Sequence, residues 1–222
     1  MKLLHVTDLH ANRSWFRWVA DHAEEYDLVA YTGDFLDIFE ADSLGTQVRG
    51  ITAWARTLPG PLLWCPGNHD VESTAVPVSS GRWMGALPGA KAFSTSGHLD
   101  RLGQSFVRVG WRDATPRLRA LDIILAHAPP AGCFTATTNG GVADNGDLDL
   151  GDALRSAAAA PWLVLSGHIH HPARWKDRCG GTITLNSWMG ANTAVPNHIE
   201  VDTTTRKARW FGDGELADVV DL

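Results

Sequence analysis

The chain has 222 residues with a formal net charge of -6 and no strongly basic segment, which argues against a protein that mainly binds nucleic acid. Its longest apolar stretches are far shorter than a membrane span, and its start turns polar too soon for a secretory signal. Three distant cysteines without paired spacing indicate reduced thiols, so we predict a cytoplasmic protein with a single domain over residues 1–222.

The first third of the chain alternates between strand and helix patterns. Short apolar runs predict buried strands at residues 2–7, 27–32 and 62–65. Between them, two segments repeat apolar side chains at helical spacing, residues 12–25 and 43–58. Either Asn12 or Ser14 can cap the first of these helices. Strands that alternate with helices predict βαβ units, a parallel sheet and an α/β fold.

The remaining two thirds mix short strands with long loops. A loop rich in Gly, Pro and Ser is expected at 71–90, a second loop at 130–148, and a helix at 149–158. The strands expected here are 91–94, 99–102, 105–110, 121–126, 162–165, 182–185, 198–202 and 206–211. Loops as long as 130–148 inside a compact domain are usually functional, so both loops are candidates to shape a binding site.

Asp, Asn or His follows five of the predicted strands. The segments are Asp8-Leu9-His10, Gly33-Asp34, Gly67-Asn68-His69-Asp70, His127 and Gly167-His168-Ile169-His170. Ligands of open parallel α/β sheets bind beyond the carboxyl ends of the strands. Residues two apart in an extended segment face the same side, so Asp8 and His10 can reach one cleft together. The sequence therefore predicts a polar site assembled from five strand ends.

The chemistry of this set favours metal ions. Carboxylate and amide oxygens and imidazole nitrogens suit Mn, Fe, Ni or Zn. The candidate ligands are too many for one ion that must also bind water and substrate: Asp8, His10, Asp34, Asn68, His127, His168 and His170. The alternative is a buried polar network without metal, which would cost several kcal/mol in desolvation unless every group were paired. We therefore expect two divalent ions that share one bridging carboxylate.

The same motifs resemble those of the calcineurin-like metallophosphoesterase superfamily. They stand in that family's order across residues 8–170, including Gly33-Asp34-Phe35-Leu36-Asp37. The resemblance implies a four-layer α/β/β/α sandwich with a dimetal site at the strand ends. It implies that one metal is held by Asp8, His10, Asp34 and His170. It implies that the other is held by Asp34, Asn68, His127 and His168, with Asp34 as the bridge. Mn2+ or Fe2+/Fe3+ are the expected metals, with Zn2+ or Ni2+ as alternatives.

The resemblance also implies a mechanism for hydrolysis of phosphate esters. A hydroxide that bridges the two metals would attack phosphorus, so no protein nucleophile is needed. His69, which is not a ligand in the family, would protonate the leaving alkoxide or stabilise charge at phosphorus. Asp70 would orient His69 through a ring N–H.

We expect a small phosphorylated substrate, with phosphodiesters of small molecules or nucleotides favoured. The chain is short, and its HAPP and GHIH segments, on either side of a Gly-rich loop, resemble the cyclic-nucleotide-phosphodiesterase-like branch of the superfamily. A phosphomonoesterase, a nuclease and a non-catalytic scaffold on this fold are the alternatives. A nuclease would need a basic strand-binding surface, which the acidic composition does not supply. No membrane partner is expected, and the oligomeric state is left open.

Two asparagines are candidates for contact with the substrate. Asn12 lies just past the first motif, although a helix cap is an equal alternative. Asn186 follows the strand at 182–185 and could approach the site from the far side. Loop tryptophans such as Trp111 and Trp188 could stack on a base or shape a pocket, with packing as the alternative. His171 is expected to face away from its neighbours and to be exposed.

Overall fold

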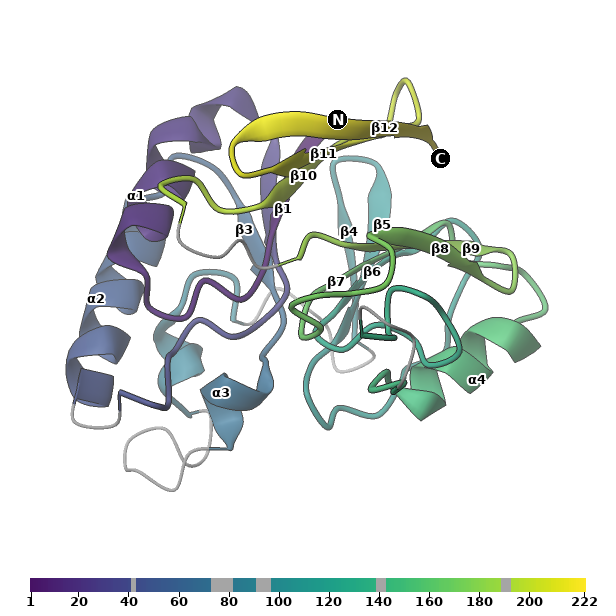
Figure 1. Ribbon diagram of the computed structural model, residues 1–222, viewed down its shortest axis with the longest axis horizontal. Helices are drawn as coiled ribbons and strands as arrows, with labels where there is room; N and C mark the ends of the chain where they lie inside the picture. The colour runs from purple at the N-terminus through teal and green to yellow at the C-terminus, as the bar shows by residue number, and fades with distance from the viewer. Residues whose placement is uncertain (41–42, 73–81, 91–96, 139–142, 189–192) are drawn as a thin grey trace.

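Two six-stranded β-sheets lie face to face in the middle of the molecule, with helices on both outer sides (Figure 1). The computed structural model describes residues 1–40, 43–72, 82–90, 97–138, 143–188 and 193–222. Helices α1 and α2 cover one flank and α4 covers the other, while both chain termini lie at the same end of the first sheet.

The first sheet is built around the N-terminal strands, in the order β12-β11-β10-β1-β2-β3. Its parallel strands are β1 (Lys2–Val6), β2 (Leu28–Tyr31) and β3 (Leu62–Trp64). Its antiparallel strands are β10 (His198–Asp202), β11 (Lys207–Gly212) and β12 (Glu215–Asp221). The chain therefore returns at its C-terminal end to complete the sheet that it began.

The second sheet has the order β4-β5-β6-β7-β9-β8. Four strands are parallel: β5 (Gln104–Val109), β6 (Ile123–Ala126), β7 (Leu163–Ser166) and β9 (Thr182–Asn186). The antiparallel edge strands are β4 (His98–Arg101) and β8 (Lys176–Cys179). Both sheets are thus mixed, with a parallel centre that can gather residues at one end.

The helices connect and cover the sheets. The longer ones are α1 (Arg13–His22), α2 (Leu44–Thr57) and α4 (Leu148–Ser156). The short ones are the four-residue α3 (Asn68–Val71) and the 3-10 turns Ala23–Glu25 and Arg82–Ala86. None of the helices within the described ranges combines the length and apolar character needed to cross a bilayer.

Alternating side chains of the strands fill three separate apolar cores. In β1, Leu3 points between the two sheets, whereas Leu4 points to the core beneath α1 and α2. In β6, Leu125 also points between the sheets, whereas Ile124 points to the core beneath α4. Strands that are buried on both faces require covering helices on each outer side. The predicted four-layer α/β/β/α sandwich is therefore confirmed.

The sequence-based boundaries hold for most elements, with a few differences. The helix predicted at 12–25 ends at His22 and continues as a 3-10 turn. Strands β8 and β12 were not predicted, and the described part of the loop 71–90 contains the turn Arg82–Ala86. The strand predicted at 91–94 lies outside the described residues. That the chain forms one domain stays a prediction.

Candidate metal centre

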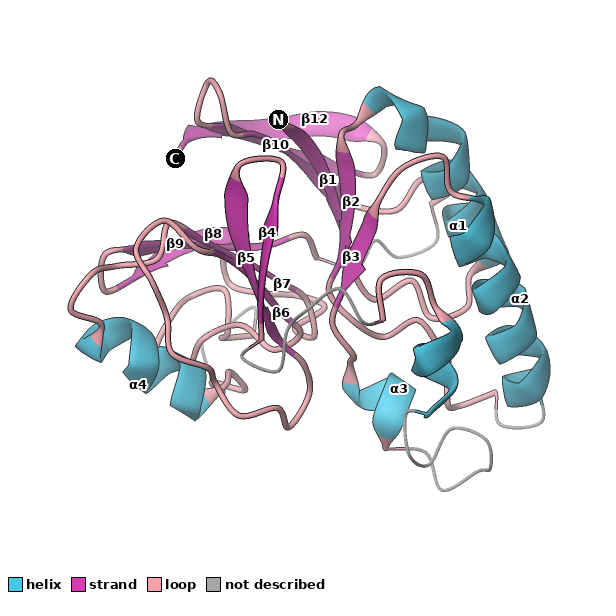
Figure 2. Ribbon diagram, turned by 180° about the vertical axis from the view of Figure 1, so that it is seen from behind, coloured by secondary structure: helices cyan, strands magenta, loops and turns pink. Residues whose placement is uncertain are grey.

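The predicted polar cluster forms where the parallel strands of both sheets end. Asp8 and His10 follow β1, Asp34 follows β2, and Asn68 opens α3 beyond β3. His127 directly follows β6, and His168 and His170 follow β7. Figure 2 shows α3 and the loops after these strands at the same end of the molecule. All seven predicted ligand residues therefore lie at one end of the two sheets.

Two of these residues, His10 and His170, lie next to the carboxylate of Asp8. The Nε2 atom of His170 lies 3.4 Å from Asp8 Oδ1, and His10 Nε2 lies 4.0 Å from the same oxygen. The Nε2 atoms of His10 and His170 are 3.3 Å apart. His10 Nε2 also lies 3.9 Å from Asp34 Oδ2. Asp8, His10 and His170, with Asp34, are the first predicted set.

The second predicted set meets at the other side of Asp34. His127 Nε2 lies 2.9 Å from Asn68 Oδ1 and 3.6 Å from Asp34 Oδ2. The ring of His168 lies beside that of His127, with 5.0 Å between the ring centroids. Because Asp34 Oδ2 is within 4.0 Å of imidazole nitrogens on both sides, Asp34 occupies the position expected of a shared ligand.

The histidine rings present lone pairs to one another. His127 Nδ1 donates to the carbonyl of Thr32 at 2.8 Å, and His10 Nδ1 donates to the carbonyl of Leu36 at 3.1 Å. A neutral imidazole has only one N–H, so each Nε2 carries a lone pair. These lone pairs face carboxylate and amide oxygens, which are also acceptors. Such a convergence of acceptors fits a bound cation.

The charge balance of the buried side chains also indicates a cation site. Asp8 and Asp34 are almost completely buried, and the ionisable side chains within 4.0 Å of their carboxylates are histidines, with no Lys or Arg among the described residues. Burial raises the pKa of Asp34 well above its usual range, and the neighbouring charges of Asp8 and Asp70 add to this effect. Burial also lowers the pKa of His10 and of His127. Neutral imidazoles cannot balance the carboxylates, so divalent cations fit this site.

The remaining imidazoles respond differently to the same surroundings. Burial lowers the pKa of His168 to about 4 and also lowers the pKa of His69. Burial acts in the same direction on His170, but its hydrogen bond to Asp8 and the charge of that carboxylate raise the pKa of His170 overall. Burial works to raise the pKa of Asp8, yet the bond from His170 and the nearby imidazoles hold it below its usual range.

The backbone at the cluster adopts conformations that side chains disfavour. Asp8, His10, Asp34 and His168 have φ angles of 50°, 41°, 59° and 64°. Left-handed backbone at residues other than glycine costs of the order of 1 kcal/mol or more and concentrates at functional sites. Gly67 and Gly167 allow close approach, because a Cβ would collide with the Asp34 and Asp8 carboxylates respectively. The backbone is therefore strained at the residues whose side chains meet in the cluster.

The predicted role of Asp70 was wrong. Its carboxylate is completely buried and accepts four backbone N–H bonds, from Gly67 and Asp34 at 2.9 Å, Phe35 at 3.0 Å and Leu36 at 3.2 Å. None of its hydrogen bonds within the described part of the chain goes to the His69 ring. Adjacent residues of a helix do not face each other, so α3 turns these two side chains apart. Asp70 therefore holds the backbone that carries Asp34.

His69 itself lies at the edge of the cluster. Its Nε2 atom lies 4.0 Å from Asp34 Oδ2, and its ring lies 4.5 Å from the ring of His10. The side chain is 11% exposed, so it can reach a bound molecule. His69 also lies close enough to Asp34 and His10 for the three side chains to hold one cation together. That His69 is a catalytic group and not a ligand stays a prediction.

The two predicted substrate contacts have other partners. Asn12 Oδ1 caps α1 by accepting from Ser14 N at 3.0 Å and Trp15 N at 3.3 Å, which is the alternative that the sequence left open. Asn186 is completely buried, and its Nδ2 donates to the carbonyls of Gly167 and Ile169 at 3.0 and 3.1 Å. A buried amide cannot touch a substrate, so the prediction for Asn186 was wrong. It braces the loop that carries His168 and His170.

Two threonines that the sequence did not single out support the cluster. Thr7 Oγ1 donates to Asp8 Oδ2 at 2.5 Å, and the carbonyl of Thr32 receives the His127 N–H. Each is a buried residue that directly follows a buried strand and precedes a predicted ligand segment. This position is the signal in the sequence that could have identified them.

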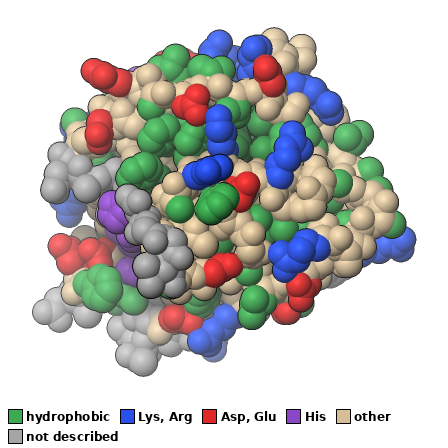
Figure 3. Space-filling model, turned by 45° about the vertical axis from the view of Figure 1, so that its right-hand side comes forward, with side chains coloured by type: hydrophobic (Ala, Val, Ile, Leu, Met, Phe, Trp, Pro, Cys, Tyr) green, Lys and Arg blue, Asp and Glu red, His purple; other side chains and the backbone are tan. Residues whose placement is uncertain are grey.

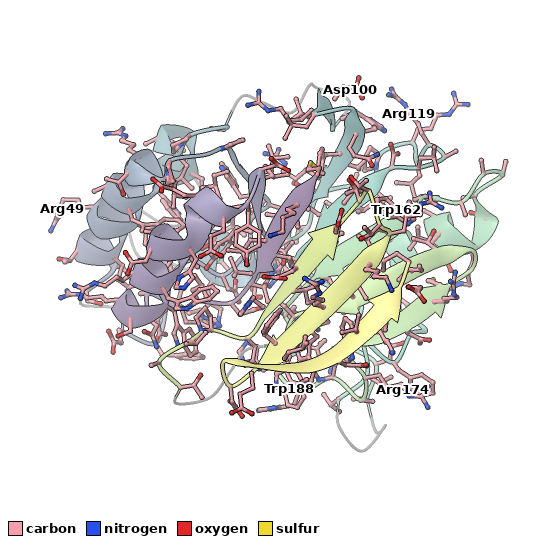
Figure 4. All side chains as sticks on the ribbon, turned by 90° about the horizontal axis from the view of Figure 1, so that it is seen from above. Arg49, Asp100, Arg119, Trp162, Arg174 and Trp188 are labelled. Carbon is pink, nitrogen blue, oxygen red and sulfur yellow. The ribbon has the colours of Figure 1, made fainter. Side chains whose placement is uncertain are left out.

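A hollow of about 600 Å³ opens beside two of the predicted metal ligands, His168 and His170. It is lined by Thr138, Asn145 and the run from His168 to His171. His171 was expected to face away, but it borders this hollow and accepts a hydrogen bond from Trp188 Nε1 at 3.0 Å. Figure 3 shows histidine side chains that reach the surface near acidic and hydrophobic ones, and Figure 4 shows Trp188 at an edge of the molecule, opposite Asp100 and Arg119. The cluster is therefore open to a ligand from outside.

Comparisons with known proteins agree with this geometry. The family model described as the calcineurin-like phosphoesterase superfamily domain matches residues 1–194. No curated protein matches the sequence. Three solved structures share the fold, each over nearly the full length of both chains. The protein TT1561 of Thermus thermophilus has 14% identity and a TM-score of 0.62, covering 96% of this chain and 98% of that chain.

The other two are described as phosphate-ester hydrolases. A dimetal phosphatase from Danio rerio has 11% identity and a TM-score of 0.60, over 96% of this chain and 95% of that chain. An archaeal phosphodiesterase has 16% identity and a TM-score of 0.54, over 95% and 99%. At these identities the likeness shows the fold alone, whereas the family match covers most of the sequence. The chain belongs to the calcineurin-like phosphoesterase superfamily and is a hydrolase of phosphoric esters.

Proposed function

We propose that the protein is a dimetal phosphodiesterase that acts on small molecules or nucleotides. The observation that carries this proposal is the convergence of acceptor atoms around Asp34, where His10 and His127 turn their lone pairs toward the same carboxylate. The hollow beside His168 and His170 supplies room for a phosphorylated ligand at this point.

The donor atoms sort into two sets for the two cations. Asp8, His10, Asp34 and His170 would hold one, and Asp34, Asn68, His127 and His168 would hold the other. When bound, two divalent cations neutralise phosphate charge and lower the pKa of a water molecule toward neutrality. Oxygen and imidazole donors without thiolate favour Mn2+ or Fe2+/Fe3+, with Zn2+ and Ni2+ as weaker candidates.

His69 would donate a hydrogen bond from Nε2 to the leaving oxygen, or transfer a proton to it when the ring is an imidazolium. Its Nδ1 accepts a hydrogen bond from Ile38 N at 3.5 Å, so in the neutral ring the proton is on Nε2. Nε2 is also the atom that faces the cluster, 4.0 Å from Asp34 Oδ2. A leaving alkoxide is a strong base, and protonation of such a group in the transition state typically contributes 10²–10⁴-fold. Diesters with poor leaving groups would depend on His69 the most.

The molecular surface and the cysteines support the rest of the proposal. A net charge of -6 favours a small substrate over a polynucleotide. Cys65, Cys133 and Cys179 are all buried and free, which is typical of a reducing compartment, and we propose the cytoplasm.

The decisive experiment is a metal-reconstituted screen on the wild type and on His69→Ala. The substrates are p-nitrophenyl phosphate, its bis-ester and the cyclic nucleotides. We expect the diesters to be preferred, and we expect His69→Ala to retain both metals by elemental analysis while kcat on the cyclic nucleotides, whose leaving group is an alkoxide, falls by at least about 100-fold. Preference for the monoester would favour the phosphomonoesterase, and salt-dependent binding of DNA would favour the nuclease. Two bound metals without activity on any ester would indicate a scaffold.

A further inference from the structure

A tryptophan lies beside the metal-ligand histidines without a role in the proposed chemistry. The ring of Trp111 lies 4.8 Å from that of His168 and 5.9 Å from that of His127, measured between centroids. The residue is half-buried, so part of its ring remains open to a ligand. Trp111 therefore borders the cluster beside His127 and His168, whereas the ring of His69 lies beside that of His10.

The indole of Trp111 is held in place before any ligand arrives. Its Nε1 donates to Glu72 Oε1 at 2.6 Å, and its backbone N donates to the carbonyl of Pro66 at 2.8 Å. Glu72 is fixed in turn by the guanidinium of Arg112 at 2.7 Å. A rigid aromatic ring loses little conformational entropy when a planar group stacks on it.

The open part of Trp111 lines a second hollow next to the first. This hollow measures about 200 Å³ and is bordered by Trp111, Arg112, Ala128, Asn145 and Asp147, among others. Asn145 also borders the larger hollow over His168 and His170. The two hollows therefore meet at Asn145, and a molecule with its phosphate at the metal site can extend into the space beside Trp111.

The polar groups of the smaller hollow favour a neutral ligand group. Arg112 is paired with Glu72, and Asp147 Oδ1 accepts from Leu150 N as the cap of α4. The guanidinium charge of Arg112 is balanced by Glu72, and the carboxylate of Asp147 would repel a second phosphate. The side chain of Asn145 is exposed and makes no hydrogen bond to any residue of the described ranges. A primary amide both donates and accepts, so it can pair with the edge of a heterocycle.

We propose that Trp111 and Asn145 form a binding site for a planar heterocycle, of the nucleobase kind, on the group that stays attached to phosphorus. The stacking surface is Trp111, and the amide of Asn145 reads the polar edge. The substrate class is then a nucleoside phosphodiester, and the group that leaves does so beside His69. This inference rests on the proposed phosphodiesterase function.

The test compares two diesters with the same leaving group. The p-nitrophenyl ester of thymidine 5′-monophosphate and methyl p-nitrophenyl phosphate both release p-nitrophenolate, so the ratio of their kcat/KM values isolates the retained group. With Mn2+-loaded enzyme we expect the wild type to favour the thymidine ester by tenfold or more. Base stacking on an aromatic ring is worth enough that Trp111→Leu should lower this ratio about tenfold. Trp111→Phe should keep part of the preference.

Trp111→Leu can disturb the neighbouring ring of His168, so a second variant, Asn145→Ala, tests the site without changing that contact. Because the Asn145 side chain is exposed and unbonded within the described structure, its removal should leave folding intact and lower the ratio about threefold. Trp162→Leu is the matched control, since Trp162 is also half-buried but borders neither hollow. It should leave the ratio unchanged. Equal kcat/KM values for the two esters in the wild type, or a loss that is the same for both in Trp111→Leu, would overturn the inference.

A binding measurement separates this inference from the proposed function. Calorimetric titration compares thymidine 5′-monophosphate with methyl phosphate on wild type and on Trp111→Leu. We expect the wild type to bind thymidine 5′-monophosphate about tenfold more tightly than methyl phosphate. We expect Trp111→Leu to bind the two ligands equally. Absence of hydrolysis of either ester would contradict the proposed function, whereas equal affinity for the two phosphates would contradict the nucleobase site.

Discussion

At the scale of single residues, the direction of a side chain decides its role. The sequence Gly67-Asn68-His69-Asp70 places four chemically useful residues side by side, and adjacency suggested that Asp70 supports His69. The short helix α3 instead sends them to different places. Asn68 faces His127, His69 borders the cluster, and Asp70 binds backbone behind Asp34. Three neighbouring residues therefore serve three different purposes.

The carboxylate of Asp70 should prove structural when it is replaced by an amide. Asp70→Asn retains one acceptor oxygen, so about two of the four buried N–H groups lose their partner. Each unsatisfied group costs about 1–3 kcal/mol, so we expect the free energy of unfolding to fall by about 2–6 kcal/mol. Metal affinity should fall as well, because Asp34 is displaced. Urea unfolding and metal titration measure both effects.

Asp37→Asn provides the matched control for this substitution. Asp37 Oδ1 accepts a single bond from Phe39 N at 2.9 Å, and the oxygen of an asparagine can accept the same bond. It should change stability little. If Asp70→Asn kept wild-type stability and metal affinity but lost turnover, Asp70 would act through His69 after all.

At the scale of secondary-structure elements, the loop after β7 depends on its neighbour β9. Asn186 ends β9 and binds the carbonyls of Gly167 and Ile169, while its Oδ1 accepts from Trp188 N at 2.8 Å. The loop that includes these carbonyls carries one predicted ligand of each metal, His168 and His170. A strand that holds no ligand thus fixes two of them through one amide.

Removal of this amide should therefore weaken both metal sites together. In Asn186→Ala, two buried carbonyls lose their donor, and we expect the free energy of unfolding to fall by about 2–4 kcal/mol. Metal affinity should fall about 10–100-fold, as is usual when an outer support of a metal site is lost. Calorimetric titration with Mn2+ measures this loss. A normal affinity, or the loss of one ion alone, would contradict the proposed bracing role.

The elements also show what sequence patterns can and cannot predict. The core strands were predicted because they are apolar and β-rich, and α1 because its apolar residues repeat at helical spacing. Strands β8 and β12 were missed because both are edge strands with exposed, charged side chains and little alternation. The seven predicted ligand residues could be picked out by type and position at the strand ends, whereas the contacts of Asp70 and Asn186 run across the fold and no local pattern contains them.

At the scale of the whole molecule, the metal site joins the two sheets. Asp8, Asp34 and Asn68 come from the ends of β1, β2 and β3 in the first sheet. His127 and the His168–His170 segment come from β6 and β7 in the second. Without cations, the buried carboxylates of the first sheet would face neutral imidazoles, which cannot balance their charge. The stability of the assembly should therefore depend on the metals.

Removal of the metals should lower the melting temperature, because cations bind the folded site and not the unfolded chain. Metal present at 1,000 times its Kd would stabilise the fold by about 4 kcal/mol, which corresponds to roughly 10 °C in Tm for a chain of this size. Scanning calorimetry before and after chelation measures the shift, and added Mn2+ should restore it. The shift should shrink as the pH falls from 7 to 5, because the raised pKa of His170 lets that ring take up a proton in this range, and a protonated imidazole cannot bind metal. Asp34→Asn, which keeps the oxygen that accepts from His69 N at 2.8 Å, should abolish the shift at every pH. An unchanged Tm after complete chelation, or an equal shift in Asp34→Asn, would show that the two sheets are joined without metal at Asp34.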